Sequence, residues 1–135
     1  MNREAPQERK KLNVAFVCLR GGESEWGYRA ALANLSREEK SVLNMSHVGL
    51  AKLDPESGDN PLLDAHIIFS PWPKHVIDSR EESDVYRASL ARNPFNPPFV
   101  HFPRNEGAEQ KAVGTIVETI REEIRRRGLL KNKGR

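Results

Sequence analysis

Cys18 carries the most reactive side chain of this sequence and is its only cysteine. It stands near the end of the apolar run 12–19, just before a glycine pair. A thiol between a buried strand and the N-terminus of a helix is stabilised as a thiolate, because the helix dipole and free backbone N–H groups favour negative charge. The position therefore predicts a nucleophile that could attack a phosphate group and form a phosphocysteine. The alternative is that Cys18 is a small buried apolar residue.

The turn after Cys18 contains residue types that suit a bound anion. Gly21 and Gly22 allow the backbone to curl, so that successive N–H groups as far as Ser24 can point at one anion. Arg20 can add a charge-assisted hydrogen bond. We therefore expect Arg20, Gly21, Gly22 and Ser24 to hold the anion beside the Cys18 thiol.

Apolar runs and helical stretches alternate along the chain and would position this turn. Runs rich in branched and aromatic residues predict strands at 12–19, 44–50, 64–71 and 99–102. Helical spacing and capping residues predict two helices in the first half of the chain: 24–35 with Ser24 as N-cap, and a short segment that a capping box over 36–39 opens. Two more are predicted in the second half. One spans 78–91 with a capping box between Ser79 and Glu82, and the other follows the apolar stripe from Val113 to Ile124 and ends at Gly128.

The order of these elements predicts an α/β fold. Strand–helix–strand–strand–helix–strand–helix is typical of a three-layer, flavodoxin-like, doubly wound parallel sheet of about four strands. In such sheets ligands bind in the crevice at the carboxyl ends of the strands. The turn after Cys18 would lie there, with Trp72, Arg104 and Asn105 on the rim of the crevice. Packing between helix and sheet is the alternative role of Trp72.

The string NVAFVCL, followed by a short loop and a helix, resembles the opening of the low-molecular-weight protein-tyrosine phosphatases and the related arsenate reductases. Their phosphate loop has the form C-x5-R-[ST], which puts their nucleophile at Cys18, their arginine at Ser24 and the next serine at Glu25. Their general-acid aspartate follows the last strand, where this chain has Pro103-Arg104-Asn105. The resemblance implies a phosphatase-like domain whose phosphate loop is degenerate.

The same segment resembles the cysteine-phosphorylated B domains of the sugar phosphotransferase system. Cys18-Leu19-Arg20-Gly21 matches their C-x-x-G loop, and the run IIFSP over 67–71 resembles the strand that they end with Gly-Pro. This resemblance implies phosphotransfer through Cys18 without the arginine of the phosphatases. Glu23 and Glu25 argue against the phosphate binding that both resemblances imply, because carboxylates beside a phosphate dianion repel it. The alternative is that they lie in the first turn of the helix, where the dipole favours them.

The basic residues are concentrated at the two ends of the chain. The whole sequence has a net charge of +3, but residues 1–11 have +2, residues 121–135 have +5 and residues 12–120 have −4. We interpret 1–11 as a flexible basic leader, 12–128 as a single α/β domain and 129–135 as a basic tail. The alternative function is therefore a non-enzymatic interaction module whose basic C-terminal end contacts nucleic acid or an acidic protein.

Other patterns narrow the classes of site. A single cysteine excludes an internal disulfide and a multi-cysteine zinc site. The four histidines lack metal-ligand spacing, and His66 and His101 lie in apolar runs, which favours hydrogen-bonded histidines of the core or rim. We expect no metal and no cofactor. Because the chain has no apolar run of membrane-spanning length and no apolar signal segment, we expect a cytoplasmic protein.

The residues thus predict a small domain with a degenerate cysteine phosphate loop. It would be weakly active or inactive as a phosphatase or phosphotransferase, and would bind a small anion or a phosphoprotein at the turn from Cys18 to Ser24.

Overall fold

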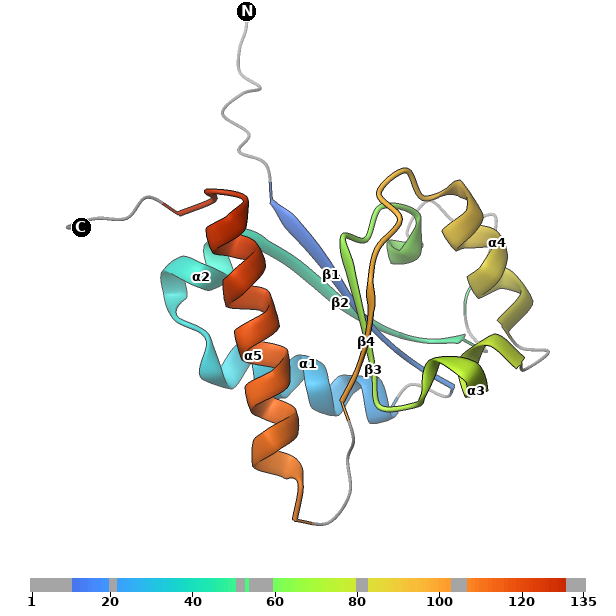
Figure 1. Cartoon of the computed structure of the whole chain (residues 1–135), viewed down its shortest axis with the longest axis horizontal. Helices are drawn as coiled ribbons and strands as arrows, with labels where there is room; N and C mark the ends of the chain where they lie inside the picture. Colours follow the sequence, from blue (N-terminus) through green and yellow to red (C-terminus); the bar gives the residue numbers. More distant parts are fainter. Residues whose placement is uncertain are drawn as a thin grey trace, which may run out of the picture.

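Four of the apolar runs form one parallel sheet in the computed structural model of the chain (Figure 1). Its strands are β1 (Leu12–Cys18), β2 (Leu43–Gly49), β3 (Ile67–Ser70) and β4 (Phe99–His101), and their order in the sheet is β2-β1-β3-β4. The structure describes residues 11–19, 22–50, 53, 60–79, 83–102 and 107–130, with the backbone alone at 22 and 23. The predicted leader therefore lies outside the described residues except for Lys11.

β1 lies inside the sheet because its side chains are apolar on both faces. Every residue of β1 except Asn13 is buried. Val14 and Phe16 belong to one core cluster, and Ala15 and Val17 belong to a second one on the opposite face. β1 pairs with β2 along its whole length, from Leu12–Leu43 to Cys18–Gly49, and it pairs with β3 on its other side. A strand buried on both faces is typical of a parallel sheet covered by helices.

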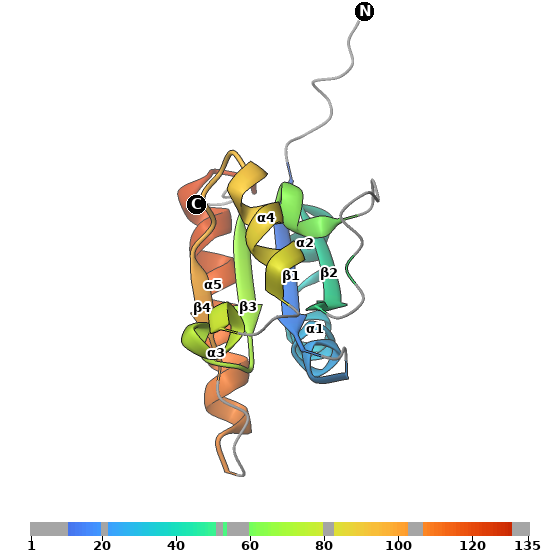
Figure 2. The ribbon, with the colours of Figure 1, turned by 90° about the vertical axis from the view of Figure 1, so that its right-hand side faces the viewer.

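Helices cover both faces of this sheet, so the chain folds in three layers (Figure 2). One face carries α1 (Gly22–Asn34), α2 (Arg37–Ser41) and α5 (Glu109–Arg126). The other face carries the 3-10 turn η3 (Pro61–Leu63), α3 (Lys74–Ser79) and α4 (Asp84–Arg92). The predicted α/β class, with a flavodoxin-like parallel sheet of four strands, is confirmed.

The helix predicted over 78–91 is wrong at its start: α4 includes residues 84–91, but residues 78 and 79 belong to the separate helix α3. α3 begins directly after Pro73, whose carbonyl accepts the N–H of Ile77 at 3.2 Å. Ser79, expected as an N-cap, ends α3 instead, and Glu82 lies outside the described residues. Proline favours the start of a helix over its interior, so Pro73 sets the beginning of α3 and brings Ile77 into the core.

Two other helix ends follow signals that are visible in the sequence. The Ser36 hydroxyl accepts the Glu39 N–H at 3.0 Å, and the Glu39 carboxylate accepts the Ser36 N–H at 2.8 Å, so the predicted capping box opens α2. At the end of α5, Gly128 has a φ of 63°. The N–H groups of Gly128 and Leu129 donate back to carbonyls of the last turn at 3.1 Å each, in the pattern of a Schellman motif. The helix stop predicted at Gly128 is confirmed.

Aromatic rings fill the space between the sheet and α1. Phe16 stacks on Phe69 with ring centroids 5.1 Å apart, and Trp26 of α1 stacks on Phe102 at 5.9 Å. The close approach of α1 depends on Gly27, where an added Cβ would lie 2.7 Å from Phe102 Cζ and 3.0 Å from Phe16 Cδ2. Only a residue without a side chain permits this spacing between helix and rings.

We expect Gly27→Ala to lower the free energy of unfolding by about 1–3 kcal/mol, because the new methyl group must displace two fully buried rings. The matched control is Gly114→Ala in α5, where the added Cβ meets nothing within 4 Å. The control should raise the stability by about 0.5–1 kcal/mol, since alanine favours a helix more than glycine does. Urea unfolding followed by circular dichroism measures both. Similar effects of the two substitutions would contradict this role of Gly27.

Candidate functional site

The turn between β1 and α1 lies at the carboxyl edge of the sheet. From β1 the chain continues to β2 on one side, and β3 then pairs with β1 on its other side, so the strand order reverses between β1 and β3. Ligands of open α/β sheets bind outside the carboxyl ends of the strands at such a point of reversal. Cys18 ends β1 here, and α1 begins at Gly22. The topology therefore puts the predicted turn where this class of fold holds ligands.

Cys18 at the end of β1 and Ser24 in α1 contact each other. Both residues are 0% exposed, and the Cys18 thiol donates a hydrogen bond to the Ser24 hydroxyl, with Sγ and Oγ 3.2 Å apart. Ser24 is the third residue of α1, so its predicted role as N-cap is wrong. Alternation along β1 explains the contact, because Cys18 points to the same face as Val14 and Phe16, which is the face that α1 covers.

The end of β3 contributes side chains on the opposite face. Phe69 belongs to the core cluster under α1 and α5, so the next residue, Ser70, points to the side of α3 and α4. The Ser70 hydroxyl accepts the Trp72 N–H at 3.0 Å, and the Trp72 side chain packs against the core cluster of that side. The sheet thus separates the side chains of Cys18 and Ser70.

Some of the predicted site residues are not described. Arg20 and Gly21 of the turn, and Arg104 and Asn105 of the predicted rim, lie outside the described residues. Their predicted contacts with an anion stay predictions. Of the others, Gly22 is the first residue of α1, and Trp72 follows the end of β3 by two residues.

Glu25 is in the first turns of α1, close to where an anion would bind. Its carboxylate forms an ion pair with Arg29 one turn further along the helix, with 2.5 Å between Oε2 and Nη2. This pair reduces the negative charge that Glu25 would otherwise direct at a bound anion. The position in the helix also supports the interpretation that the dipole accommodates this carboxylate.

His66 is a hydrogen-bonded residue at the opposite edge of the sheet. Its Nδ1 accepts the N–H of Asn13 at 2.8 Å, which leaves the imidazole proton on Nε2. Burial lowers the pKa of His66 from its ordinary value of 6.5, and the Arg127 cation lowers it further, against the opposing effects of Asp64 and Glu123. His66 is therefore neutral at pH 7.

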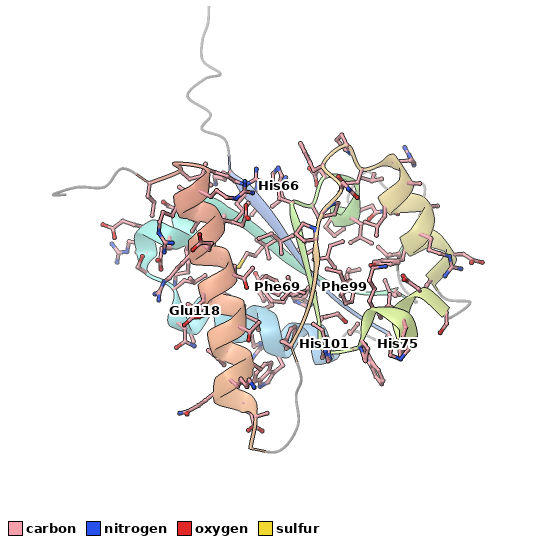
Figure 3. All side chains as sticks on the ribbon, in the orientation of Figure 1. His66, Phe69, His75, Phe99, His101 and Glu118 are labelled. Carbon is pink, nitrogen blue, oxygen red and sulfur yellow. The ribbon has the colours of Figure 1, made fainter. Side chains whose placement is uncertain are left out.

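Two of the other three histidines, His47 and His101, also have partners. His101 Nε2 lies 3.2 Å from the Pro71 carbonyl oxygen, and the His47 ring lies 4.8 Å from the Tyr28 ring. His66 is at one end of the molecule, while His75 and His101 are at the other (Figure 3). Within the part of the chain that the structure describes, no cluster of three or more His, Cys, Asp or Glu could hold a metal ion.

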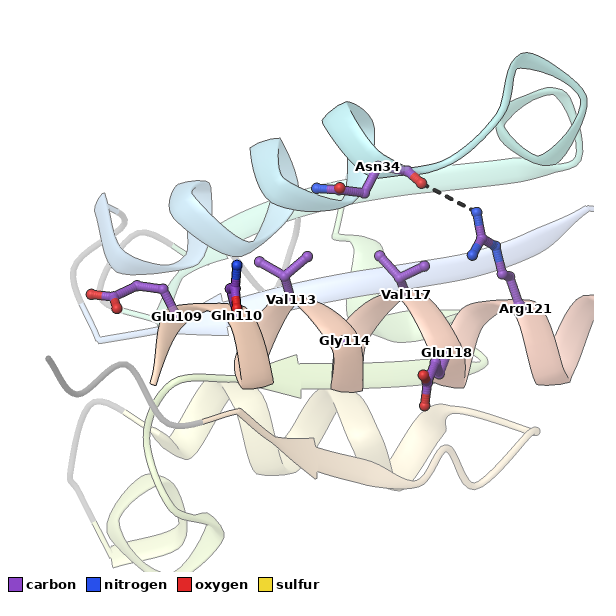
Figure 4. Close-up of a pocket in the computed structure, with 8 residues that line it drawn as sticks. All are labelled: Asn34, Glu109, Gln110, Val113, Gly114, Val117, Glu118 and Arg121. Atoms are coloured by element: carbon purple, nitrogen blue, oxygen red, sulfur yellow. Dashed lines mark hydrogen bonds between the residues drawn. The ribbon is translucent and has the colours of Figure 1, made fainter. Parts of the chain in front are cut away.

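A groove between α1 and α5 was not predicted from the sequence. It has a volume of about 560 Å³, and Val113 and Val117 of α5 face it from below α1 (Figure 4). Arg121 closes one end by donating to the Asn34 carbonyl at 3.3 Å and to the Glu39 carboxylate at 2.8 Å. Spacing along one helix could not reveal this groove, because Asn34 of α1 and the lining residues of α5, from Glu109 to Arg121, are 75 to 87 positions apart in the sequence. Its mixed lining includes no cluster suited to acid–base or nucleophilic chemistry.

Comparison of the chain with protein-family models, with curated proteins and with solved structures found no match. Among the described helices, none is long and apolar enough to cross a membrane.

We expect the Cys18 thiol of the folded protein to react with 5,5′-dithiobis(2-nitrobenzoic acid) at least about 100-fold more slowly than in the urea-unfolded chain, because its side chain is fully buried. Since Cys18 is the only cysteine, the release of thionitrobenzoate reports on it alone. Equal rates in the folded and unfolded chain would contradict the burial of this thiol.

We also expect stability to fall as the pH is lowered below about 6.5. His66 of the unfolded chain is protonated at its ordinary pKa, whereas in the folded chain its pKa is lower. The free energy of unfolding therefore decreases as the pH falls from the pKa of the unfolded chain to that of the folded chain. His66→Asn should reduce this fall, because Asn keeps an acceptor near the position of Nδ1 but does not titrate. Urea unfolding at pH 7.5 and pH 5 measures it, with His75→Asn, at an exposed position of α3, as the control. An unchanged pH dependence in His66→Asn would contradict the assignment.

Proposed function

We propose that this chain binds a small anion, such as phosphate or a phosphorylated group, at the turn between β1 and α1. The observation that carries the proposal is that α1 begins at the carboxyl end of β1, where the strand order of the sheet reverses. α1 has 13 residues, and the first N–H groups of a helix have no partner within the helix. They point toward the turn together with the positive end of the helix dipole, which is a common arrangement for holding an anion.

The electrostatics of the described part of α1 are compatible with an anion. The pairing of Glu25 with Arg29 offsets the one carboxylate whose side chain is described in this turn. Arg29 itself is exposed, so its guanidinium adds positive charge near the N-terminal half of the helix. An exposed pair of this kind has a modest effect, on the order of 0.3–1 kcal/mol.

Cys18 and Ser24 argue for binding with weak or no catalysis. A phosphocysteine mechanism needs a thiolate that reaches the phosphate, but the Cys18 thiol is fully buried and donates its proton toward Ser24. The phosphatases that the segment resembles have an arginine at the position of Ser24, which here is a buried hydroxyl. A degenerate phosphate loop that keeps its fold and binds an anion reversibly accounts for both features.

The proposal includes a cytoplasmic location and either a free anion or a phosphoprotein as partner. The single cysteine is compatible with a reducing compartment.

Titration of the full chain with orthophosphate, against chloride at equal ionic strength, tests the proposal. We expect phosphate to raise the melting temperature and to shift the backbone amide resonances of residues 22–25 selectively. Arg29→Gln should weaken phosphate binding by about two- to fivefold, because it leaves the Glu25 charge unpaired beside the anion. Arg87→Gln is the matched control, because it also removes one exposed, paired arginine, but on α4. Unshifted amides at 22–25, or equal effects of the two substitutions, would refute the proposal.

Incubation with p-nitrophenyl phosphate and with a phosphorylated histidine carrier protein tests the catalytic side. We expect no turnover above about 1% of that of an active cysteine phosphatase and no label on Cys18, because the Cys18 side chain is fully buried. Hydrolysis that is abolished by Cys18→Ser would show instead that the loop is catalytic.

A further inference from the structure

A second cavity lies at the amino-terminal edge of the sheet, opposite the turn that follows Cys18. It has a volume of about 550 Å³, within the range of ligand sites, and we call it the Phe95 pocket. Its lining is Lys11 at the start of β1, His66 before β3, Phe95 in the loop after α4, and Arg127 and Leu129 at the end of α5. None of these residues is acidic.

The polar groups of the Phe95 pocket are hydrogen-bond donors. Lys11 supplies an ammonium group and Arg127 a guanidinium group. His66 adds its Nε2–H, since Nδ1 accepts the Asn13 N–H, and Nε2 has no hydrogen-bond partner among the described residues. Arg127 shares Glu123 with Arg126, so this one carboxylate is divided between two cations. The pocket therefore suits an anion that accepts several hydrogen bonds.

Phe95 gives the pocket an aromatic surface. It is the one large hydrophobic residue that is strongly exposed in the described chain, with 49% of its surface accessible. Hydrogen bonds of the buried Asn93 hold the loop that carries Phe95. The Asn93 side-chain amide donates to the carbonyls of Leu62 and Ala65, and its oxygen accepts the Phe95 N–H at 2.6 Å. The Phe95 ring lies 4.4 Å from the His66 ring. An exposed ring on an anchored loop is preorganised to stack on another planar group.

The two basic ends of the sequence are joined to the chain at this same edge. The start of β1 and the end of α5 both lie at the upper end of the molecule in Figure 1. Residues 1–10 have a net charge of +1, and residues 131–135 contain three basic residues and no acidic one. The sequence therefore has further positive charge before Lys11 and after Leu130, which favours a ligand with repeated negative charges over one with a single charge.

We propose that the Phe95 pocket binds single-stranded nucleic acid. One base stacks on Phe95, and the adjoining phosphates are bound by Lys11, Arg127 and the Nε2–H of His66. In a duplex the bases stack on one another and leave no ring face accessible to Phe95. In a single strand each base can turn a ring face to Phe95, so we expect the pocket to prefer single strands. The site is independent of the anion site proposed for the β1–α1 turn, because the two lie at opposite edges of the sheet.

Fluorescence anisotropy of the full chain with a labelled 12-nucleotide oligothymidine tests this proposal. We expect Phe95→Ala to weaken binding by at least about fivefold, up to about 150-fold, because a base loses its stacking partner, and Phe95→Trp to retain it. An abasic 12-mer should bind to wild type as weakly as oligothymidine binds to Phe95→Ala. Lys11→Gln and Arg127→Gln should each lower the slope of log K against log salt concentration by about 0.7.

Lys74→Gln is the matched control for the cation contacts, because it removes an exposed lysine at the other edge of the sheet and should leave the salt slope unchanged. Urea unfolding checks that each variant folds. The proposal would be overturned if Phe95→Ala bound as tightly as wild type, if the abasic strand or a duplex bound as tightly as oligothymidine, or if thymidine monophosphate bound as tightly as the 12-mer.

Discussion

The burial of β1 on both of its faces is the constraint on which the rest of the structure depends. Six of its seven residues are buried, and they alternate between two core clusters that the sheet keeps apart. A strand of this kind is stable only when neighbours pair with both of its edges and helices cover both of its faces. β2 and β3 pair with the two edges of β1, and helices pack on both faces of the sheet. The order of the strands and the position of strand reversal follow from this arrangement.

The same burial determines the chemistry at the carboxyl edge. Because β1 ends with Cys18 on the face under α1, the thiol is enclosed by the helix that begins a few residues later. Gly27 allows α1 to approach the rings of Phe16 and Phe102 closely, which tightens the enclosure. The residue with the greatest intrinsic reactivity is thus placed where its packing is favourable and its access is poor. The anion site proposed for this edge rests on the first N–H groups of α1, which have no partner within the helix itself.

The two edges of the sheet differ in chemical character. The carboxyl edge combines buried hydroxyl and thiol groups with the start of a helix. The amino edge gathers the start of β1, the end of α5 and the loop after α4, and with them two cations, a neutral histidine and an exposed aromatic ring. Parallel strands explain the difference, because all of them begin at one edge and end at the other, and α5 runs back to the edge where β1 begins.

The sequence by itself determined the fold class, the approximate place of each strand, the capping box at Ser36 and the helix stop at Gly128, because these depend on local periodicity and on hydrogen bonds within a few residues. The helix predicted over 78–91 is wrong at its start, because α3 already begins after Pro73, where Ile77 is buried in the core. Only the tertiary structure decided that Cys18 is buried. It also decided that one pocket brings together Lys11, His66, Phe95 and Arg127. Residues more than 100 positions apart come together there, because the sheet and α5 bring the two chain ends to one edge.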